Sequence, residues 1–99
     1  MDADYIIVGS GSAGSVLANR LSQSGKHRVV VLEAGGTDRR FYVHLPLGYG
    51  KLFYDPKVNW MYSTQPDPGL AGSADHWPRG KILGGSSSIN AMVYIRGNR

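Results

Sequence analysis

The sequence has 99 residues and contains no cysteine. Disulfides, thiolate zinc sites, iron–sulfur clusters and a cysteine nucleophile are therefore excluded. Purely apolar runs are short, as at Val29–Leu32, whereas a membrane-spanning helix needs about 20 apolar residues. Residues 1–4 (Met-Asp-Ala-Asp) are acidic, whereas a secretory signal begins with basic residues. These absences predict a cytoplasmic protein with no transmembrane segment.

Basic residues are in excess but are not clustered. Lys and Arg number 11 against 7 Asp and Glu, for a net charge of +4, and Arg39 and Arg40 are the only adjacent basic pair. A nucleic-acid site would show a basic stripe, so we expect no nucleic-acid partner. The histidines at 27, 44 and 76 lack the spacing of metal ligands, so we expect no metal site.

Residues 1–36 have the pattern of a strand, a helix and a second strand. Tyr5–Val8 is a short β-branched and aromatic run that stops at Gly9, and residues 28–32 form a similar run. Residues 13–24 between them have a helical period, and Gly25 is suited to end the helix. One face of this helix is apolar, at Ala13, Val16, Leu17 and Leu21. The pattern predicts a βαβ unit with two buried, parallel strands, the start of an α/β Rossmann-like fold.

The remainder divides into two segments. Residues 37–79 hold all five prolines and eight of the ten aromatic residues, and only residues 60–64 read as a brief strand. We expect a long ordered loop here, because aromatic side chains seek burial. Residues 80–99 open with a glycine- and serine-rich loop. Ser86 or Ser87 is a suitable N-cap for a short helix to about Met92, and residues 93–95 would then be extended.

Three glycines lie between the first strand and the helix, in the pattern Gly9-x-Gly11-x-x-Gly14. Such glycines permit a tight turn, close approach of a pyrophosphate and close helix–strand packing. The helix N-terminus offers amide donors to the phosphates, and Glu33 ends the second strand where a ribose diol would be bound. Because an acidic Glu33 disfavours a 2′-phosphate, the pattern predicts FAD or NAD rather than NADP, without separating the first two.

The loop at Gly84 and Gly85, followed by three serines, has the composition of a second anion-binding turn. It could face the same pyrophosphate from the other side. By itself, such a loop is better explained as the cap of a structural helix, and only the first glycine pattern makes the anion-binding role the stronger interpretation.

Three stretches resemble the glucose–methanol–choline (GMC) oxidoreductases, which use FAD. Residues 4–14 (DYIIVGSGSAG) and 32–36 (LEAGG) resemble the start of that family, and residues 78–94 (PRGKILGGSSSINAMVY) resemble its first signature. The resemblance covers essentially the whole chain and is strongest for choline-dehydrogenase-like bacterial alcohol dehydrogenases. It favours FAD over NAD and implies that residues 1–99 form an incomplete FAD-binding domain, divided at 36/37 and 79/80, with no substrate domain.

The resemblance also implies roles for individual residues. Ser12 and Ala13 would contact the pyrophosphate, Glu33 the adenosine ribose, and Ala34 the adenine. Ile82 and Ser86 would line the path of the flavin, and residues further along would follow the isoalloxazine ring, namely Asn90, Ala91, Met92 and Val93. Relatives that bind flavin covalently carry histidine at the position of Ile89, so non-covalent FAD is expected here.

The function implied is oxidation of a small alcohol to an aldehyde or ketone by hydride transfer to the flavin. The family's base is a histidine near the C-terminus of a much longer chain, and no residue here matches it, so no catalytic residue is expected among these 99. Three alternatives remain open: an NAD-dependent Rossmann dehydrogenase, a flavin-binding fragment without activity, and a lyase on the same fold. The alcohol, the electron acceptor and the oligomeric state are not predicted.

Overall fold

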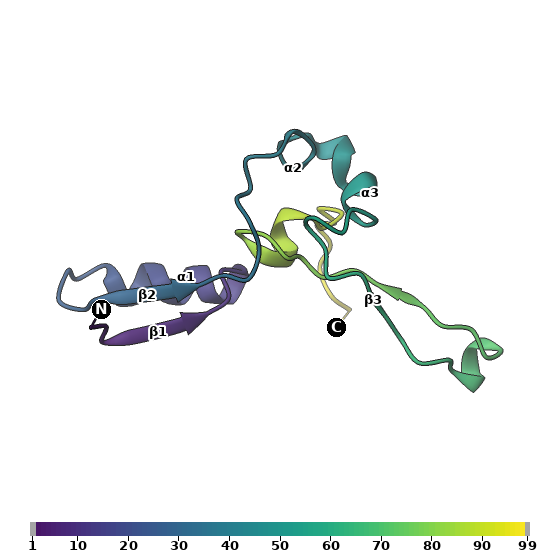
Figure 1. The fold of residues 1–99 in the computed structure, drawn as a ribbon, viewed down its shortest axis with the longest axis horizontal. Coiled ribbons are helices and arrows are strands. Elements are labelled where there is room, and N and C mark those ends of the chain that lie inside the picture. Colours follow the sequence, from purple (N-terminus) through teal and green to yellow (C-terminus); the bar gives the residue numbers. More distant parts are fainter. Residues whose placement is uncertain (1, 99) are drawn as a thin grey trace.

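The chain is elongated in the computed structural model, which describes residues 2–98. Figure 1 shows a βαβ unit at one end, short helices at the centre and a narrow β-arm at the other end. The principal extents are 54 × 34 × 31 Å and the radius of gyration is 16.6 Å. A compact domain of this length has a radius of gyration of about 13 Å. The described part of the chain includes no helix with the length and apolar character needed to cross a membrane.

The βαβ unit confirms the sequence prediction. Strands β1 (Tyr5–Val8) and β2 (Val29–Leu32) are parallel, in a register that pairs Tyr5 with Val29. Helix α1 (Ser12–Ser22) connects them, and Gly25 follows it with φ +68°. Gly14 must lack a side chain, because a Cβ there would overlap the carbonyl oxygen of Gly9. The third glycine of the motif therefore brings the helix close to the strand.

The apolar faces of this unit are largely uncovered, which corrects the expectation of buried strands. Of the residues in β1 only Ile7 is buried, and Val8 is 85% exposed. Helix α1 buries no residue, and Val16 and Leu17 on its apolar face are more than half exposed. The period of the sequence identified the faces that are suited to burial, but β1, α1 and β2 are too few elements to cover both sides of a sheet.

The hydrophobic core lies at the centre of the molecule. Three short helical turns follow the βαβ unit: α2 (Phe41–His44), η1 (Pro46–Gly48) and α3 (Tyr49–Leu52). They pack beside residues from the third segment, and Val43 lies against the cluster. Its buried members are Leu52, Val58, Ile82 and Ile89. The region predicted as a loop is therefore ordered, as expected, but it contains helical turns that a four-residue pattern cannot reveal.

Asn59 fixes the end of α3 to the β-arm. Its side chain is 2% exposed, and its Nδ2 donates to the carbonyl of Phe53 at 2.9 Å. Its Oδ1 accepts from the amides of Met61 and Arg79, at 2.9 and 3.0 Å. A buried amide with both ends hydrogen-bonded is compatible with an apolar core, because its polar atoms remain satisfied.

The β-arm is a two-stranded antiparallel hairpin. Strands β3 (Tyr62–Ser63) and β4 (His76–Trp77) flank the turn η2 (Pro68–Leu70). The strand predicted at 60–64 is thus confirmed at its centre. The rings of Trp60 and Tyr62 are stacked 5.9 Å apart. These rings pack on one another at the surface rather than in a core, since both residues are at least 40% exposed.

The glycine- and serine-rich segment forms a 3-10 turn, η3 (Gly85–Ser88), in place of the predicted helix. Gly84 precedes the turn with φ +90°, and no serine side chain caps it. The serine hydroxyls hydrogen-bond to nearby backbone groups, which competes with helix formation. Residues 93–95 form no strand, because no described strand lies beside them; Val93 is 78% exposed.

Candidate functional site

The two glycine-rich loops, far apart in sequence, are in contact. The amide of Gly84 donates to Oγ of Ser10 at 3.0 Å. Gly85 lies so close to the first loop that a Cβ there would be 3.0 Å from Cα of Gly11. The second loop is placed by its neighbours as well, since the amide of Leu83 donates to the carbonyl of Gly36 at 2.8 Å beyond β2. The sequence hypothesis that both loops face one site agrees with this geometry.

Gly11 borders open space. It precedes α1 with φ −67° and ψ −173°, angles that any residue adopts. A Cβ at this position would meet no atom within 4 Å. Neither backbone strain nor packing within the described chain therefore requires glycine here. A group bound against the backbone would require it, as the pyrophosphate of a dinucleotide does.

Gly9 makes the turn from β1 toward α1. Its φ of +93° is a conformation that favours glycine, and its amide donates to the carbonyl of Leu32 at 2.7 Å. The first hydrogen bond of α1 runs from the amide of Ser15 to the carbonyl of Gly11, at 2.9 Å. The amides of Ser12, Ala13 and Gly14 precede that bond, so the first turn of α1 presents the donors and the positive dipole end that phosphates bind.

Glu33 is held at the edge of the first loop. Its Oε2 accepts from the amide and the hydroxyl of Ser10, at 2.9 and 2.6 Å, and its Oε1 accepts from the amide of Gly35 at 2.8 Å. These three hydrogen bonds fix the orientation of the carboxylate. Ala34 follows it with its side chain exposed, in keeping with the expectation that it would lie beside a ligand.

Burial raises the pKa of Glu33, but its hydrogen bonds more than offset this effect. The hydroxyl and amide of Ser10, together with the amides of Gly35 and Ala34, favour the ionised form, and the pKa lies below its ordinary value. Glu33 is therefore ionised at neutral pH, which is the form that accepts hydrogen bonds from a sugar diol.

The three serines of the second loop mostly stabilise the loop itself. Ser87 Oγ donates to the carbonyl of Gly84 at 2.5 Å, and Ser88 Oγ donates to the carbonyl of Leu83 at 2.8 Å. Ser86 differs, because its Oγ accepts from the amide of Gly80 at 3.1 Å and its hydroxyl proton can donate elsewhere. Of the three, Ser86 is thus the serine best able to contact a ligand.

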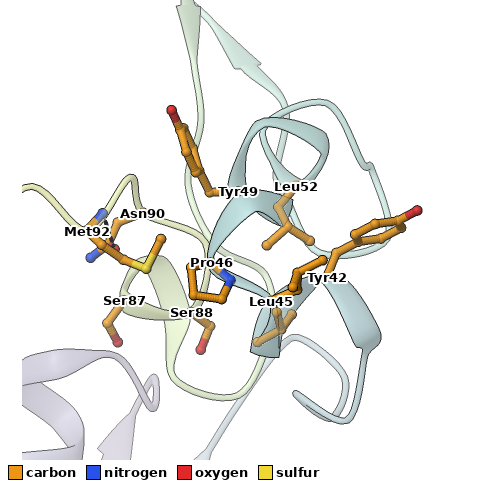
Figure 2. Close-up of a pocket in the computed structure, with 10 residues that line it drawn as sticks. Tyr42, Leu45, Pro46, Tyr49, Leu52, Ser87, Ser88, Asn90 and Met92 are labelled. Atoms are coloured by element: carbon orange, nitrogen blue, oxygen red, sulfur yellow. Dashed lines mark hydrogen bonds between the residues drawn. The ribbon is translucent and has the colours of Figure 1, made fainter.

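Most of the residues expected along the flavin line one or both of two pockets, and Asn90 lines both. Asn90 and Met92 line a pocket between η3 and the helical turns α2 and α3, shown in Figure 2. Ser86, Asn90 and Ala91 line a second pocket beside Phe53 and Pro78. Val93 is exposed and lines neither pocket.

Ile82 is fully buried in the core cluster. The expectation that its side chain lines the ligand path is therefore corrected, because a side chain with no exposed surface cannot contact a ligand. Ile82 instead anchors the second loop to the core, next to Gly35, whose missing side chain makes room for the backbone of Lys81 and Ile82.

No cluster of three or more metal-ligating side chains occurs among residues 2–98. The histidines lie in separate environments. His27 packs edge-on against Tyr5, Nε2 of His44 is 2.9 Å from the carbonyl of Asp38, and Nε2 of His76 is 2.7 Å from the carbonyl of Phe53. None of these contacts involves the glycine-rich loops.

Comparison with known sequences gives close relatives over nearly the whole chain. An oxygen-dependent choline dehydrogenase of Photobacterium profundum is 54% identical over 95 residues, which are 96% of this chain and 17% of that protein. An alcohol dehydrogenase [acceptor] of Pseudomonas putida is 58% identical with the same coverage. The chain therefore spans about one sixth of the length of these relatives.

Solved structures agree with this similarity. Pyridoxine 4-oxidase from Mesorbium loti superposes with a TM-score of 0.90 at 43% identity, over 97% of this chain and 19% of that one. An FAD-dependent oxidoreductase from Chaetomium thermophilum superposes with a TM-score of 0.77 at 31% identity, over 98% of this chain and 16% of that one. The sequence pattern described as GMC oxidoreductase matches residues 3–99, and the chain belongs to that family.

Proposed function

We propose that residues 1–99 are the FAD-binding portion of an oxidoreductase that acts on the CH–OH group of a small alcohol. The observation that carries this proposal is the open space at Gly11, bordered by the first turn of α1, by the loop at Gly84 and Gly85, and by the oriented carboxylate of Glu33. These groups fit the two phosphates and the ribose of a dinucleotide. Family membership and the flavoprotein relatives support FAD as that dinucleotide.

Each part of the site would hold a different part of FAD. The amides of Ser12 and Ala13 would bind the pyrophosphate, and Glu33 would accept a hydrogen bond from the adenosine ribose. Ser86 would donate its hydroxyl proton from the second loop. Asn90, Ala91, Met92 and Val93 would lie toward the flavin ring, where backbone and amide dipoles tune its reactivity. Ile89 is aliphatic and buried, which supports non-covalent binding.

Bound FAD would supply the redox chemistry by accepting a hydride as the alcohol becomes an aldehyde or ketone. The described residues would bind and orient it, and the three histidines already contact groups elsewhere in the chain. We therefore place no catalytic residue in this segment. The names of the relatives support an alcohol of the choline type as substrate.

Glu33→Gln tests the ribose contact. The amide keeps the size of the side chain but loses the charge, and hydrogen bonds to charged groups are worth about 1.5–3 kcal/mol. The protein to use is the full-length apoprotein of which residues 1–99 would be the FAD-binding portion, called the intact apoprotein below. We expect its Glu33→Gln variant to bind FAD about 10- to 100-fold more weakly than the unmodified protein does, as measured by isothermal titration calorimetry. Asp55→Asn, at a carboxylate that bonds the amide of Lys57 away from the site, is the matched control. Equal affinities for Glu33→Gln and the unmodified protein would refute the assignment.

The lowered pKa of Glu33 predicts how FAD affinity depends on pH. Because hydrogen bonds hold the pKa of Glu33 in the folded apoprotein below its ordinary value, its carboxylate stays ionised, and able to accept from the ribose, until the pH falls to that lowered pKa. Affinity should therefore show no Glu33-dependent change from pH 8 to about pH 5, and should begin to fall only as the pH drops through the lowered pKa. Protonation of the adenine would affect every variant equally. A titration in which Glu33→Gln gave the same curve would contradict this prediction.

A further inference from the structure

Ser10 connects the two loops of the candidate site through a single side chain. Its Oγ accepts from the amide of Gly84 at 3.0 Å and donates to Oε2 of Glu33 at 2.6 Å. Its own amide donates to the same carboxylate oxygen at 2.9 Å, and its carbonyl accepts from Oγ of Ser15 at 2.8 Å. All the polar groups of Ser10 are therefore engaged, in a residue that is only 5% exposed.

The hydroxyl of Ser10 lies in a buried position, with little access to water. Because Ser10 is buried, removal of its hydroxyl would leave the amide of Gly84 without this acceptor and would leave Oε2 of Glu33 with one donor fewer. The direction of the bonds is also fixed. The amide of Gly84 can only donate, so the proton of Ser10 must point toward the carboxylate. The hydrogen bond to Glu33 is charge-assisted, which agrees with its short length.

We propose that Ser10 is a positioning residue for the dinucleotide, which holds the ribose-binding carboxylate of Glu33 and the pyrophosphate-facing loop at Gly84 in one hydrogen-bonded unit. The inference rests on the proposed function. Ser10 itself is not required to touch the ligand. It acts on the ribose through Glu33 and on the phosphates through the loop at Gly84, so one substitution should affect both ends of the ADP moiety.

The other charged groups on the surrounding elements either contact groups other than Glu33 or lie away from the N-terminal end of α1. Asp4 before β1 accepts from the amide of Arg28, at the opposite end of the strands. Arg20 lies in the last turn of α1. After β2, Asp38 lies 3.9 Å from His44, and on the second loop the ammonium of Lys81 lies 4.5 Å from the ring centroid of Trp60. Ser10 is thus the side chain that favours ionisation of Glu33 most directly.

The test measures ADP and FAD binding to the intact apoprotein between pH 4 and pH 8. Ser10→Ala should weaken ADP binding about tenfold at pH 7. It should also raise the pH at which affinity begins to fall, because the ionised carboxylate loses a donor. Ser10→Thr, which keeps the hydroxyl, should restore the original pH profile. Ser22→Ala removes an exposed hydroxyl that bonds only within α1, and it should leave both affinity and profile unchanged.

A double-mutant cycle separates positioning from general destabilisation. In a Glu33→Gln background, Ser10→Ala should cost no more than about threefold, because the charged partner is already absent. Ser10→Gly provides a second hydroxyl-free variant if the alanine variant does not fold. An unmodified protein that bound neither ADP nor FAD would overturn the proposed function. Normal flavin binding with an unshifted pH profile in Ser10→Ala and Ser10→Gly would overturn this inference alone.

Discussion

Gly11→Val is expected to give an intact protein that folds normally and retains no FAD. The backbone at Gly11 has angles open to any residue, and a Cβ there would meet no atom of the described chain within 4 Å, so the fold tolerates a side chain. Valine is a poor N-cap, which costs α1 about 1 kcal/mol. Its methyl groups, however, would occupy the position where the pyrophosphate meets the backbone. Absorbance of the purified protein in the flavin range measures retention.

Two comparisons make the Gly11 result specific. Gly50→Val, on α3, is the matched control, because Gly50 also has open space at its Cβ and its φ is not positive. It should keep its full complement of FAD. Gly14→Ala should instead destabilise the fold itself, since its Cβ would overlap the carbonyl of Gly9. A Gly11→Val protein that kept a full complement of FAD would show that the phosphates do not approach this glycine.

Residues 1–99 expressed alone are expected to aggregate or to remain partly molten, to bind FAD weakly and to oxidise no alcohol. The accessible surface of the chain is 7759 Å², whereas a compact protein of 10.7 kDa has about 5,500 Å². Large hydrophobic side chains contribute to this surface: Ile6, Val8 and Leu47 are more than 60% exposed, as are Phe41 and Tyr54. Exposed apolar surface promotes association.

The experiment compares this segment with the intact protein. Size-exclusion chromatography, thermal denaturation followed by circular dichroism, and an alcohol-dependent dye-reduction assay are run on both. We expect a broad or absent thermal transition for the segment and a cooperative one for the intact protein. A monodisperse, yellow and catalytically active segment would overturn this prediction, and with it the proposal that residues 1–99 hold no catalytic group.

The sequence predicted the βαβ unit well because its signals are local. The run at Tyr5–Val8, the helical period and the three glycines each need only neighbouring residues to be interpreted, and the structure confirms the parallel pair and the turn at Gly9. The prediction was less accurate where the outcome depends on distant partners. No period reveals that Val58 and Ile89 share a core, or that Val16 and Leu17 on the apolar face of α1 remain exposed.

The site residues show the same division. The spacing of the loop glycines and Glu33 was enough to propose them as ligand-binding residues, whereas nothing in that spacing distinguished Ser10. It occupies a variable position of the glycine pattern, and its importance arises from contacts with Glu33, 23 residues away, and with Gly84, 74 residues away. The only local signal was a hydroxyl placed between two glycines. The role of Ile82 was inferred from the family resemblance, which indicates a position along the chain but does not show that its side chain is buried in the core.

The bridge between Gly36 and Ile82 gives the molecule a modular layout. The polypeptide leaves the nucleotide-binding end at one point and returns to it at almost the same point, after an excursion through the helical turns and the β-arm. The entropy lost on closing such an excursion grows slowly, by about 0.6 kcal/mol for each doubling of its length. The tip of the arm, beyond the bridge between Asn59 and Gly80, can therefore change in length at little entropic cost while the two glycine-rich loops keep their contact.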